Sequence, residues 1–465
     1  MGKRRSTAHP YIPNSARAAK EAMLREIGAA SEDDLYEDIP EALRFRGRLA
    51  IPEALASEPE LRRHVEGLLA KNRSCAESLN FLGAGCTQHF VPAVCDEINA
   101  RAEFLTAYAG EPYDDHGRFQ SLFDYASLMG ELLNMDVVNV PTYDGFQATA
   151  TGLRMAARIT GRSEVLVSRA VSADKLSKIR DYLRPRIRVQ LFDFDPVTGE
   201  PDLASLEEAI SNETAAVYFE SPSYLGVIPS CGDDVSATAH DVGALSVVGV
   251  DPSTLGVLAP PADYGADIVV GDLQPLGMHM AYGGGHAGFI ATRDEPRFVL
   301  EYPSRLFGIT STSVEGEYGF GDVAFERTSF ALREGGKEWV GTAAALWGIT
   351  AGAYLALLGP QGMRELGETI LQRSHYAAKR LARIPGVRAP RFRGAFFHEF
   401  VVDFSRTGKS VTRIHRALLR RGIFGGKDLS SEFASLKGCA LYSVTEVHTK
   451  GDLDRLADAI EEAVA

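Results

Sequence analysis

The sequence predicts an α/β protein in which a large doubly wound domain precedes a smaller α+β domain at the C-terminus. Short apolar runs alternate with helical patterns over residues 76–310, and a second, smaller alternation covers residues 361–465. The chain has 465 residues, more than a single hydrophobic core usually serves, so several domains are expected. We expect a helical arm at 1–75, the large domain at 76–310, a linker with an interdomain helix at 311–360, and the small domain at 361–465.

A helical arm is predicted for the first 75 residues because they contain no strand pattern. Residues 15–28 place apolar and charged side chains at helical spacing and end at Gly28. Ser31 with Asp34 forms a capping-box pattern, which predicts that another helical piece begins there. An arm of this kind usually packs over a partner or over the next domain.

Six short apolar runs predict the parallel sheet of the large domain. Strands that are buried on both faces have this continuous apolar composition. The runs are VLVSRAV (165–171), VQLFDF (189–194), AAVYFES (215–221), ALSVVGVD (244–251), DIVVGD (267–272) and GFIATR (288–293). Helical segments between them, including Ala204–Ile210 and Val235–Val242, would cover both faces of the sheet.

The small domain is predicted from the pattern that follows Gly359-Pro360. A long amphipathic helix, MRELGETILQRSHYAAKRLARI, comes first. It is followed by the strand FFHEFVVDF, the helix SVTRIHRALLRRG, the strand CALYSVTE and the helix DLDRLADAIEEAV.

The composition excludes several classes of partner. Hydrophobic residues make up 45% of the chain, charged residues 24%, and the formal net charge is −13. This balance disfavours nucleic acid and anionic membranes, because both require a basic surface. The longest apolar runs are strand-sized and the N-terminus has no apolar signal-peptide core, so we expect a cytoplasmic protein.

The cysteines and histidines do not predict a metal site. The cysteines are odd in number and contain no CxxC pair, so we interpret them as reduced and mostly structural. They are Cys75, Cys86, Cys95, Cys231 and Cys439. The histidines lack ligand spacing on one element and are interpreted as core or surface residues. Those considered are His89, His116, His279, His286 and His398.

A large doubly wound domain before a small α+β domain is the order found in fold-type-I pyridoxal phosphate enzymes. Such an enzyme needs a helix N-terminus for the phosphate, a carboxylate for the pyridinium nitrogen and a lysine for the aldimine. Asp144-Gly145 precedes the helical run FQATATGLRMAAR and is a candidate for the first part, although an ordinary helix start explains it equally well. Asp251 ends a predicted strand and is a candidate for the second, with a turn at Asp251-Pro252 as the alternative.

The third part, the lysine, has no candidate. Lys178 and Lys337 are consecutive lysines, so residues 179–336 contain none. The aldimine lysine of this fold follows the strand carboxylate by a few tens of residues, which places it inside this gap. At the expected position the chain has Gln274 and Pro275, and neither side chain has the amine that an imine requires. Lys337 lies well beyond the usual spacing and is not favoured as a replacement.

A glycine-rich stretch, Gly283–Gly288, formally matches GxGxxG. It leads into a strand and not into a helix, which is the wrong context for a nucleotide site. We expect a tight loop near a ligand or a partner. Gly425–Asp428 is not a Walker loop, and no Gly-x-Ser-x-Gly motif predicts a serine hydrolase.

Several stretches spread along nearly the whole chain carry a family resemblance. They are ADIVVGDLQPLG, DIPEALR, HPYIPN (9–14), FLGAGCTQHFVPAV (81–94), YDGFQATA, GALSVVGVDPSTLGVLAPP, YLALLGPQGMRELGE and SVTEVHTKGDLDRLADAI. They resemble the alpha subunit of the split glycine dehydrogenase (decarboxylating), the P-protein of the glycine cleavage system, and the combination of the first two is specific to this family.

The resemblance implies a fold-type-I subunit that carries no aldimine lysine. Family alpha subunits pair with a beta subunit that holds pyridoxal phosphate, and the pair assembles into a heterotetramer. The complex decarboxylates glycine and passes the aminomethyl group to the lipoyl arm of the H-protein. The chain would then be an oxidoreductase subunit that is inactive alone, without catalytic residues of its own. Its vestigial pocket would include Asp144, Gly145, Asp251 and Gln274.

Two loops, 108–117 and 333–342, depart from the family pattern in charge and bulk. Drift in loops whose function lies on the other subunit explains these departures as well as a functional change does. The candidates for an interface or a substrate channel are Tyr108, Glu111, His116, Gly284, Gly285, Arg327, Glu334, Lys337 and Trp339. The alternatives are a non-catalytic partner-binding or regulatory paralogue, or a subunit of a related decarboxylase with a different amino acid or carrier.

Overall fold

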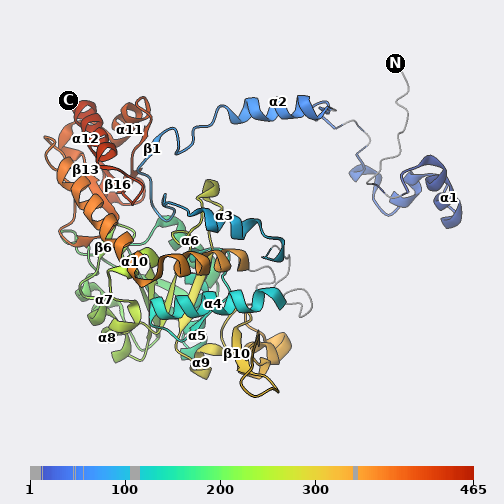
Figure 1. The fold of residues 1–465 in the computed structure, drawn as a ribbon, viewed down its shortest axis with the longest axis horizontal. Coiled ribbons are helices and arrows are strands. Elements are labelled where there is room, and N and C mark those ends of the chain that lie inside the picture. Colours follow the sequence, from blue (N-terminus) through green and yellow to red (C-terminus); the bar gives the residue numbers. More distant parts are fainter. Residues whose placement is uncertain are drawn as a thin grey trace. The chain divides into compact units, whose positions relative to one another are not determined.

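The computed structural model of the protein describes residues 12, 14–45, 47, 49–55, 57–104, 116–338 and 344–465 (Figure 1). They belong to two units, Met1–Asn72 and Arg73–Ala465. The four predicted regions, with boundaries at 75, 310 and 360, remain predictions.

The first unit is helical, as its pattern predicts. Helix α1 (Arg17–Ile27) ends at Gly28, whose left-handed backbone lets its N–H bond back to the last turn. Ser31 and Asp34 form the predicted capping box at the start of the 3-10 helix η1 (Glu32–Tyr36). The other helical elements are η2 (Glu41–Leu43) and α2 (Glu58–Leu69). Among the described residues of this unit none is buried, so they form no core of their own.

A seven-stranded sheet in the order β2-β9-β8-β7-β5-β3-β4 forms the centre of the second unit. Its strands are β2 (Val137–Val138), β3 (Glu164–Ser168), β4 (Arg188–Phe192), β5 (Thr214–Ser221), β7 (Leu245–Val250), β8 (Ile268–Asp272) and β9 (Gly288–Thr292). All six predicted strands are present. Strands β4, β3, β5, β7 and β8 are parallel, as predicted.

Strand β9 corrects the prediction of a wholly parallel sheet, because it is antiparallel to both β8 and β2. The chain returns from β8 through residues 273–287, where the sole helical element is the short η6 (Ala281–Gly283). A parallel partner would require a crossover to the other end of the sheet, usually through a longer helix.

Helices cover both faces of this sheet, which is therefore doubly wound (Figure 1). Val165, Val247 and Ile268 point to one face, where they pack against two helices. These are α5 (Gly145–Thr160) and α6 (Ala173–Leu183). Val217 and Phe289 point to the opposite face. The helices on that face are α7 (Leu203–Ala209), α8 (Gly232–Asp241), α4 (His116–Leu133) and α10 (Ala345–Leu381).

A three-stranded antiparallel sheet, β13-β16-β15, forms the centre of the C-terminal part. Its strands are β13 (Glu399–Asp403), β15 (Lys427–Asp428) and β16 (Cys439–Ser443), and α11 (Val411–Leu419), α12 (Lys450–Val464) and the second half of α10 pack against it. Helix α10 is interrupted at Gly359-Pro360, because proline lacks the N–H and its ring clashes with the preceding turn. The short β1 (Leu79–Asn80) pairs with β14 (Ile423–Phe424), which joins the start of this unit to its C-terminal part.

The remaining elements of the second unit were not predicted individually. They are α3 (Ala93–Ala100), β6 (Val227–Ile228), α9 (Pro296–Val299), β12 (Ala395–Phe396), the hairpin β10 (Phe307–Ser311) with β11 (Tyr318–Asp322), and the 3-10 helices η3 (Ala102–Phe104), η4 (Pro252–Gly256), η5 (Pro261–Tyr264), η7 (Phe325–Arg327), η8 (Ser329–Gly335), η9 (Ser405–Thr407) and η10 (Ala434–Leu436).

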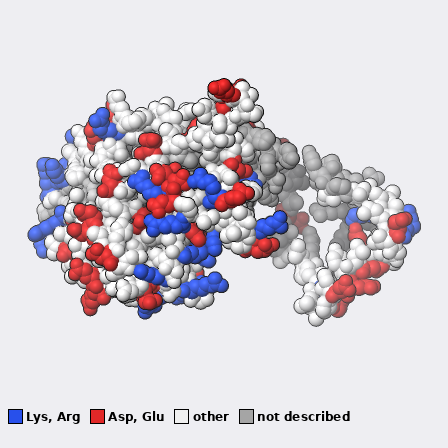
Figure 2. All heavy atoms as spheres, turned by 90° about the horizontal axis from the view of Figure 1, so that it is seen from below, with Lys and Arg blue, Asp and Glu red and all other residues white. Residues whose placement is uncertain are grey.

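Charged side chains of both signs are intermixed on the face shown in Figure 2, where Lys and Arg lie scattered among Asp and Glu. Within the described ranges, no helix has the length and apolar character needed to cross a membrane.

Candidate functional site

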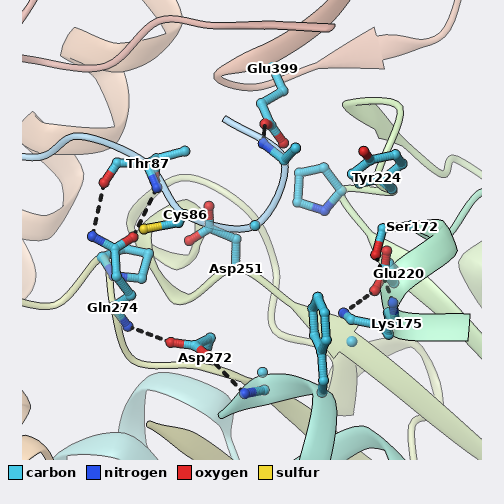
Figure 3. A pocket seen from close by; sticks show the side chains of 18 of the residues that line it. Cys86, Thr87, Ser172, Lys175, Glu220, Tyr224, Asp251, Asp272, Gln274 and Glu399 are labelled. Atoms are coloured by element: carbon cyan, nitrogen blue, oxygen red, sulfur yellow. Dashed lines mark hydrogen bonds and ion pairs between the residues drawn. The ribbon is translucent and has the colours of Figure 1, made fainter. Parts of the chain in front are cut away.

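A pocket of about 370 Å³ lies at the carboxyl ends of the parallel strands of the large sheet (Figure 3). Strands β5, β7 and β8 contribute Glu220, Val250 and Gly271 to its wall. Further parts of the wall come from the N-terminus of α5, the first turn of α6, the segment 84–87 and residues 398–399 before and in β13. Open α/β sheets bind their ligands at this edge, so the pocket is the candidate site.

The N-terminus of α5 is capped by two carboxylates. The Gln147 N–H donates to Asp144 Oδ1 at 2.6 Å, and the Gly145 N–H donates to Asp272 Oδ2 at 2.8 Å. A Cβ added at Gly145 would lie 3.0 Å from the Asp272 Cβ, so the helix start packs closely on the end of β8. The predicted helix start is present, but a phosphate placed there would meet two negative charges in place of free N–H groups.

Asp251 follows β7 and forms an ion pair with His398. His398 Nε2 lies 2.8 Å from Asp251 Oδ2, while Ser253 donates its N–H and its hydroxyl to Oδ1 at 2.9 and 2.8 Å. Burial opposes ionisation of Asp251, but the hydrogen bond and charge of His398 lower the pKa of Asp251 to about 2. Burial likewise opposes the charged form of His398, yet Asp251 raises the pKa of His398. Both oxygens of the predicted pyridine-nitrogen carboxylate are therefore engaged by protein groups.

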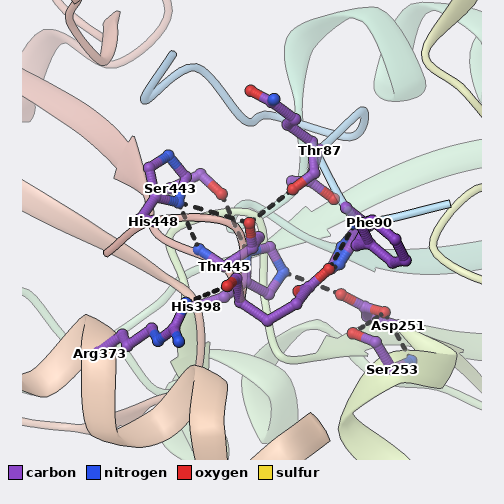
Figure 4. A network of polar contacts seen from close by, with 12 residues as sticks. Thr87, Phe90, Asp251, Ser253, Arg373, His398, Ser443, Thr445 and His448 are labelled. Carbon is purple, nitrogen blue, oxygen red and sulfur yellow. Dashed lines mark hydrogen bonds and ion pairs between the residues drawn. The ribbon is translucent and has the colours of Figure 1, made fainter. Parts of the chain in front are cut away.

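The ion pair belongs to a wider polar network that joins the segment before α3 to the C-terminal part (Figure 4). His398 Nδ1 lies 3.2 Å from Ser443 Oγ. Glu446 accepts the Phe90 N–H at 2.6 Å and contacts His89 Nδ1 at 2.9 Å. The side chains of His89 and His398 are buried, as residues with structural roles would be.

The expected lysine position carries no amine in the pocket. Pro275 lines the wall there. Gln274 is buried and uses its carboxamide to hold the segment 84–87: its oxygen accepts the Thr87 N–H at 3.0 Å, and its nitrogen donates to the Thr87 carbonyl at 2.9 Å. The same nitrogen donates to the Met278 carbonyl at 3.2 Å. Gln274 therefore supports the wall of the pocket and is not free to bind a ligand.

A lysine that the sequence analysis missed, Lys175, lines the pocket from the first turn of α6 (Figure 3). Its ammonium pairs with Glu220, which also accepts the hydroxyl of Tyr218 at 2.9 Å. Burial opposes the charged form, but the charge of Glu220 raises the pKa of Lys175 well above its ordinary value. A protonated amine cannot attack a carbonyl. The sequence could have indicated Lys175, because it lies in VSADK, a helix-cap pattern directly after a predicted strand.

The residues of this pocket do not fit pyridoxal phosphate held through an imine. Carboxylates cap the helix N-terminus where the phosphate was expected, both oxygens of Asp251 are engaged, and Pro275 lines the pocket where the lysine was expected. Lys175 is held protonated by Glu220.

The predicted interface residues lie outside the pocket wall where the structure describes them. Tyr108, Glu111 and Trp339 lie outside the described residues, and His116 begins α4 with a side chain that is likewise outside them. Arg327 pairs with Asp294 at 2.5 Å, Glu334 is exposed, and the Lys337 N–H donates to Ser329 Oγ at 2.9 Å. Gly284 and Gly285 follow Gly283, which does line the pocket. Their roles as interface or channel residues remain predictions.

Glu338 is a further residue that the sequence analysis did not single out. It lies 2.5 Å from Arg154 Nε and 2.7 Å from Arg158 Nη1, both on α5. Arg158 also pairs with Glu301. The half-buried ion pairs of Glu338 attach the end of the 333–338 segment to α5. The sequence could have indicated Glu338, because it is an acidic residue in a loop that departs from the family pattern.

Comparison with known proteins places the whole chain in one family. Residues 9–460 match the family described as the glycine cleavage system P-protein. A protein of Staphylothermus marinus named probable glycine dehydrogenase (decarboxylating) subunit 1 is 38% identical, and the match covers 98% of this chain and 99% of that protein. A Geobacillus kaustophilus protein of the same name is 37% identical, over 98% of this chain and all of that protein.

Solved structures agree with this assignment. A crystal structure of glycine decarboxylase (P-protein) of the glycine cleavage system, in inhibitor-bound form, superposes with a TM-score of 0.83 at 35% identity. The match covers 98% of this chain and all of that one. Two less similar enzymes share the fold. A Burkholderia pseudomallei sphingosine-1-phosphate lyase has a TM-score of 0.64 at 17% identity, over 92% of this chain and 94% of that one. An Escherichia coli cysteine desulfurase has a TM-score of 0.61 at 16% identity, over 86% of this chain and 98% of that one. This fold is the fold-type-I arrangement that the sequence predicts. The chain belongs to the glycine cleavage system P-protein family.

Proposed function

We propose that this chain is the alpha subunit of a glycine dehydrogenase (decarboxylating) complex and that pyridoxal phosphate is held by a partner beta subunit. When bound to an enzyme of this fold, the cofactor acts as an electron sink during decarboxylation. The complex would release carbon dioxide from glycine and pass the aminomethyl group to the lipoyl arm of the H-protein. We propose the cytoplasm as its compartment, in keeping with five free thiols.

The observation that carries this proposal is the pocket itself. It lies at the sheet edge where open α/β folds bind their ligands, Pro275 lines it where we expected the imine lysine, and Asp272 engages the helix N-terminus where we expected the phosphate. A family member whose own pocket cannot hold the cofactor needs another chain to supply it. The names of its relatives, subunit 1 in each case, support such a partner.

The match in length and identity supports the enzymatic role over a regulatory paralogue. Relatives at 36–38% identity align over nearly their full lengths, so no domain that would suggest another role has been gained or lost within the match. The departures in residues 108–117 and 333–342 are local, and in the second stretch Glu338 forms half-buried ion pairs with α5.

The test is co-expression with a beta chain encoded beside this one, followed by the exchange of bicarbonate carbon into the carboxyl group of glycine with lipoylated H-protein. Exchange that requires both chains is the expected result. A coloured complex without exchange would mean another amino acid or carrier, and the absence of any complex would contradict the subunit assignment.

Borohydride reduction followed by mass spectrometry of both chains locates the cofactor independently of activity. We expect the pyridoxyl adduct on the beta chain and none on this chain. The cofactor content of the complex should be unchanged by Asp251→Asn, since Asp251 is engaged by His398 and Ser253. An adduct on Lys175 would overturn the assignment of the cofactor to the partner.

A further inference from the structure

We propose that the pocket binds a small primary amine in its ammonium form, that the Glu399 carboxylate and the Ser223 hydroxyl accept its N–H groups, and that the ligand carries no carboxylate of its own. The inference does not depend on the proposed function, because every residue that it uses belongs to this chain and neither cofactor nor partner is needed.

The charges of the pocket wall leave one carboxylate without a positive partner. Three basic side chains of the wall each pair with a carboxylate: Lys175 with Glu220, His286 with Asp272 at 3.0 Å and His398 with Asp251 at 2.8 Å. The two other carboxylates of the wall are Asp144 and Glu399. Asp144 caps α5, whose N-terminus carries partial positive charge. Within the described residues, Glu399 is therefore the wall carboxylate that neither a side-chain cation nor a helix end balances.

Glu399 is the first residue of β13, and its buried carboxylate is fixed in place. Its Oε1 accepts the Ala84 N–H at 2.5 Å, and a Cβ at Gly83 would lie 2.1 Å from the same oxygen. Burial raises the pKa of Glu399, and the charge of His398 and the Ala84 N–H offset this effect only in part. A cation beside the carboxylate would favour its ionised form and supply a counter-charge.

The Ser223 hydroxyl is a second acceptor in the wall. Ser223 is 7% exposed, and its Oγ has no hydrogen-bond partner among the described residues. A tight turn fixes its backbone: the Ser223 N–H donates to the Val227 carbonyl, and the Ser223 carbonyl accepts the Gly226 N–H, both at 2.8 Å. A buried polar group without a partner is unfavourable, so a ligand N–H that reaches this oxygen would satisfy it.

Backbone packing brings the two acceptors to the same side of the pocket. A Cβ at Gly226 would lie 2.1 Å from the Glu399 carbonyl oxygen, so the turn that holds Ser223 packs directly on the first residue of β13. Figure 3 shows Glu399 and Tyr224, the residue after Ser223, on one side of the pocket and Asp272 on the other. An ammonium group on the first side would meet a carboxylate and a hydroxyl from separate segments of the chain.

These acceptors favour a primary ammonium over other cations. A primary ammonium group can donate three hydrogen bonds, as a lysine side chain does, whereas a quaternary ammonium has no N–H to donate. A metal ion needs several ligands, and in the described part of the chain no group of three or more histidine, cysteine and carboxylate side chains could hold one.

The rest of the wall restricts the rest of the ligand. The structure describes every residue of the wall, and none of its basic side chains is left unpaired, so a ligand carboxylate would find no cation there. Apolar side chains also line the pocket, namely Phe146, Pro222, Val250 and Pro275. The volume of about 370 Å³ is near the lower end for ligand pockets. The ligand is therefore a short apolar amine and not an amino acid.

The first test is isothermal titration calorimetry of the full-length chain, without cofactor, with n-butylammonium as the probe. We expect saturable binding at a single site. 1-Butanol, butyrate and tetramethylammonium should each bind at least about tenfold more weakly, because the first lacks the charge, the second reverses it and the third has no N–H donor. Glycine should bind as weakly, since its carboxylate has no basic partner. Equal binding of tetramethylammonium or of glycine, or no saturable binding at millimolar n-butylammonium, would overturn the proposal.

The second test assigns the site by substitution. Glu399→Gln removes the charge but keeps an acceptor for the Ala84 N–H, and it should weaken n-butylammonium binding at least about tenfold. Ser223→Ala removes one hydrogen bond and should weaken binding about three- to tenfold.

The matched control is Glu432→Gln, which removes a carboxylate that lies outside the wall. Glu432 pairs with Lys427 at 2.7 Å and accepts the Tyr224 hydroxyl at 3.0 Å, so its loss should change the affinity less than about twofold. Thermal unfolding of each variant checks that it is folded. Wild-type affinity in Glu399→Gln, or a loss no larger than that in Glu432→Gln, would show that Glu399 does not bind the ammonium group and would refute the proposal.

Discussion

Removal of the His398 imidazole tests whether the Asp251–His398 pair holds the large domain and the C-terminal part together. Asp251 follows β7 of the large sheet, and His398 directly precedes β13. We expect His398→Ala to lower the free energy of unfolding of the chain by about 3–5 kcal/mol, because it leaves a buried carboxylate without its counter-charge.

The net stabilisation of the ionised Asp251, to which His398 makes the largest favourable contribution, follows from the pKa of Asp251. It falls from an ordinary value of 3.8 to about 2. At about 1.4 kcal/mol for each pKa unit, the interaction stabilises the folded state by about 2 kcal/mol. The rest of the expected loss reflects desolvation of the carboxylate and the space left by the ring.

The sign of the pH dependence follows from both partners. The pKa of Asp251 is lowered on folding, so its contribution is complete above about pH 4 and is lost as the pH falls toward 2. The pKa of His398 is raised on folding, so its contribution is complete below about pH 6.5 and is lost as the pH rises through the raised value. The coupling should therefore be greatest between about pH 4 and 6.5.

The assay is urea unfolding, followed by circular dichroism at pH 5.5 and 8.5, of a double-mutant cycle. Its members are the wild type, Asp251→Ala, His398→Ala and the double variant, and we expect a coupling energy of about 2 kcal/mol at pH 5.5. The matched control is His240→Ala, which breaks a His–Asp pair of the same 2.8 Å length whose histidine is 44% exposed. That pair should contribute at most about 1 kcal/mol. A coupling at Asp251 no larger than this, or one that grows between pH 5.5 and 8.5, would refute the reasoning.

Three further predictions concern the walls of the pocket and one close backbone contact. Lys175→Met should lower the free energy of unfolding by about 3–5 kcal/mol, because it leaves the buried Glu220 without its counter-charge. Adding Glu220→Gln should restore part of the lost free energy in the double variant, as urea unfolding will measure. Gln274→Leu should lower the melting temperature and speed hydrogen exchange at residue 87, since three backbone groups, the N–H and carbonyl of Thr87 and the carbonyl of Met278, lose their partners at about 1–3 kcal/mol each. Gly226→Ala should destabilise the chain far more than Gly161→Ala, as thermal unfolding will measure. Both glycines have positive φ, but a Cβ at Gly226 would lie 2.1 Å from a carbonyl oxygen, whereas a Cβ at Gly161 would meet no atom within 4 Å.

The strands and long helices could be predicted because their signals are local. A run such as ALSVVGVD has the composition of a buried strand wherever it lies in a chain, and β7 occupies Leu245–Val250 of it. The direction of β9 could not be predicted in this way. It depends on the path of residues 273–287 and on the close approach of Gly288 to the Asp144 carbonyl, which joins positions that are distant in sequence.

The site shows the same division between local and distant information. The absence of a lysine from residues 179–336 is a fact of composition, and Gln274 and Pro275, which we expected at the lysine position, both line the pocket. Lys175 was missed because the argument about spacing looked after the strand carboxylate and not before it. The interpretation of Gly145 as a phosphate site could not include Asp272, which lies 127 residues away and reaches the same N–H through the fold.

Asp272 joins three parts of the pocket wall through one carboxylate. Its two oxygens accept the N–H groups of Gly145 and Gln274 and contact the His286 imidazole. The carboxylate that caps the N-terminus of α5 is therefore the same group that holds the start of the segment after β8 and the His286 imidazole. Because one side chain carries these contacts, a substitution that removes the carboxylate would release the helix N-terminus and the imidazole together.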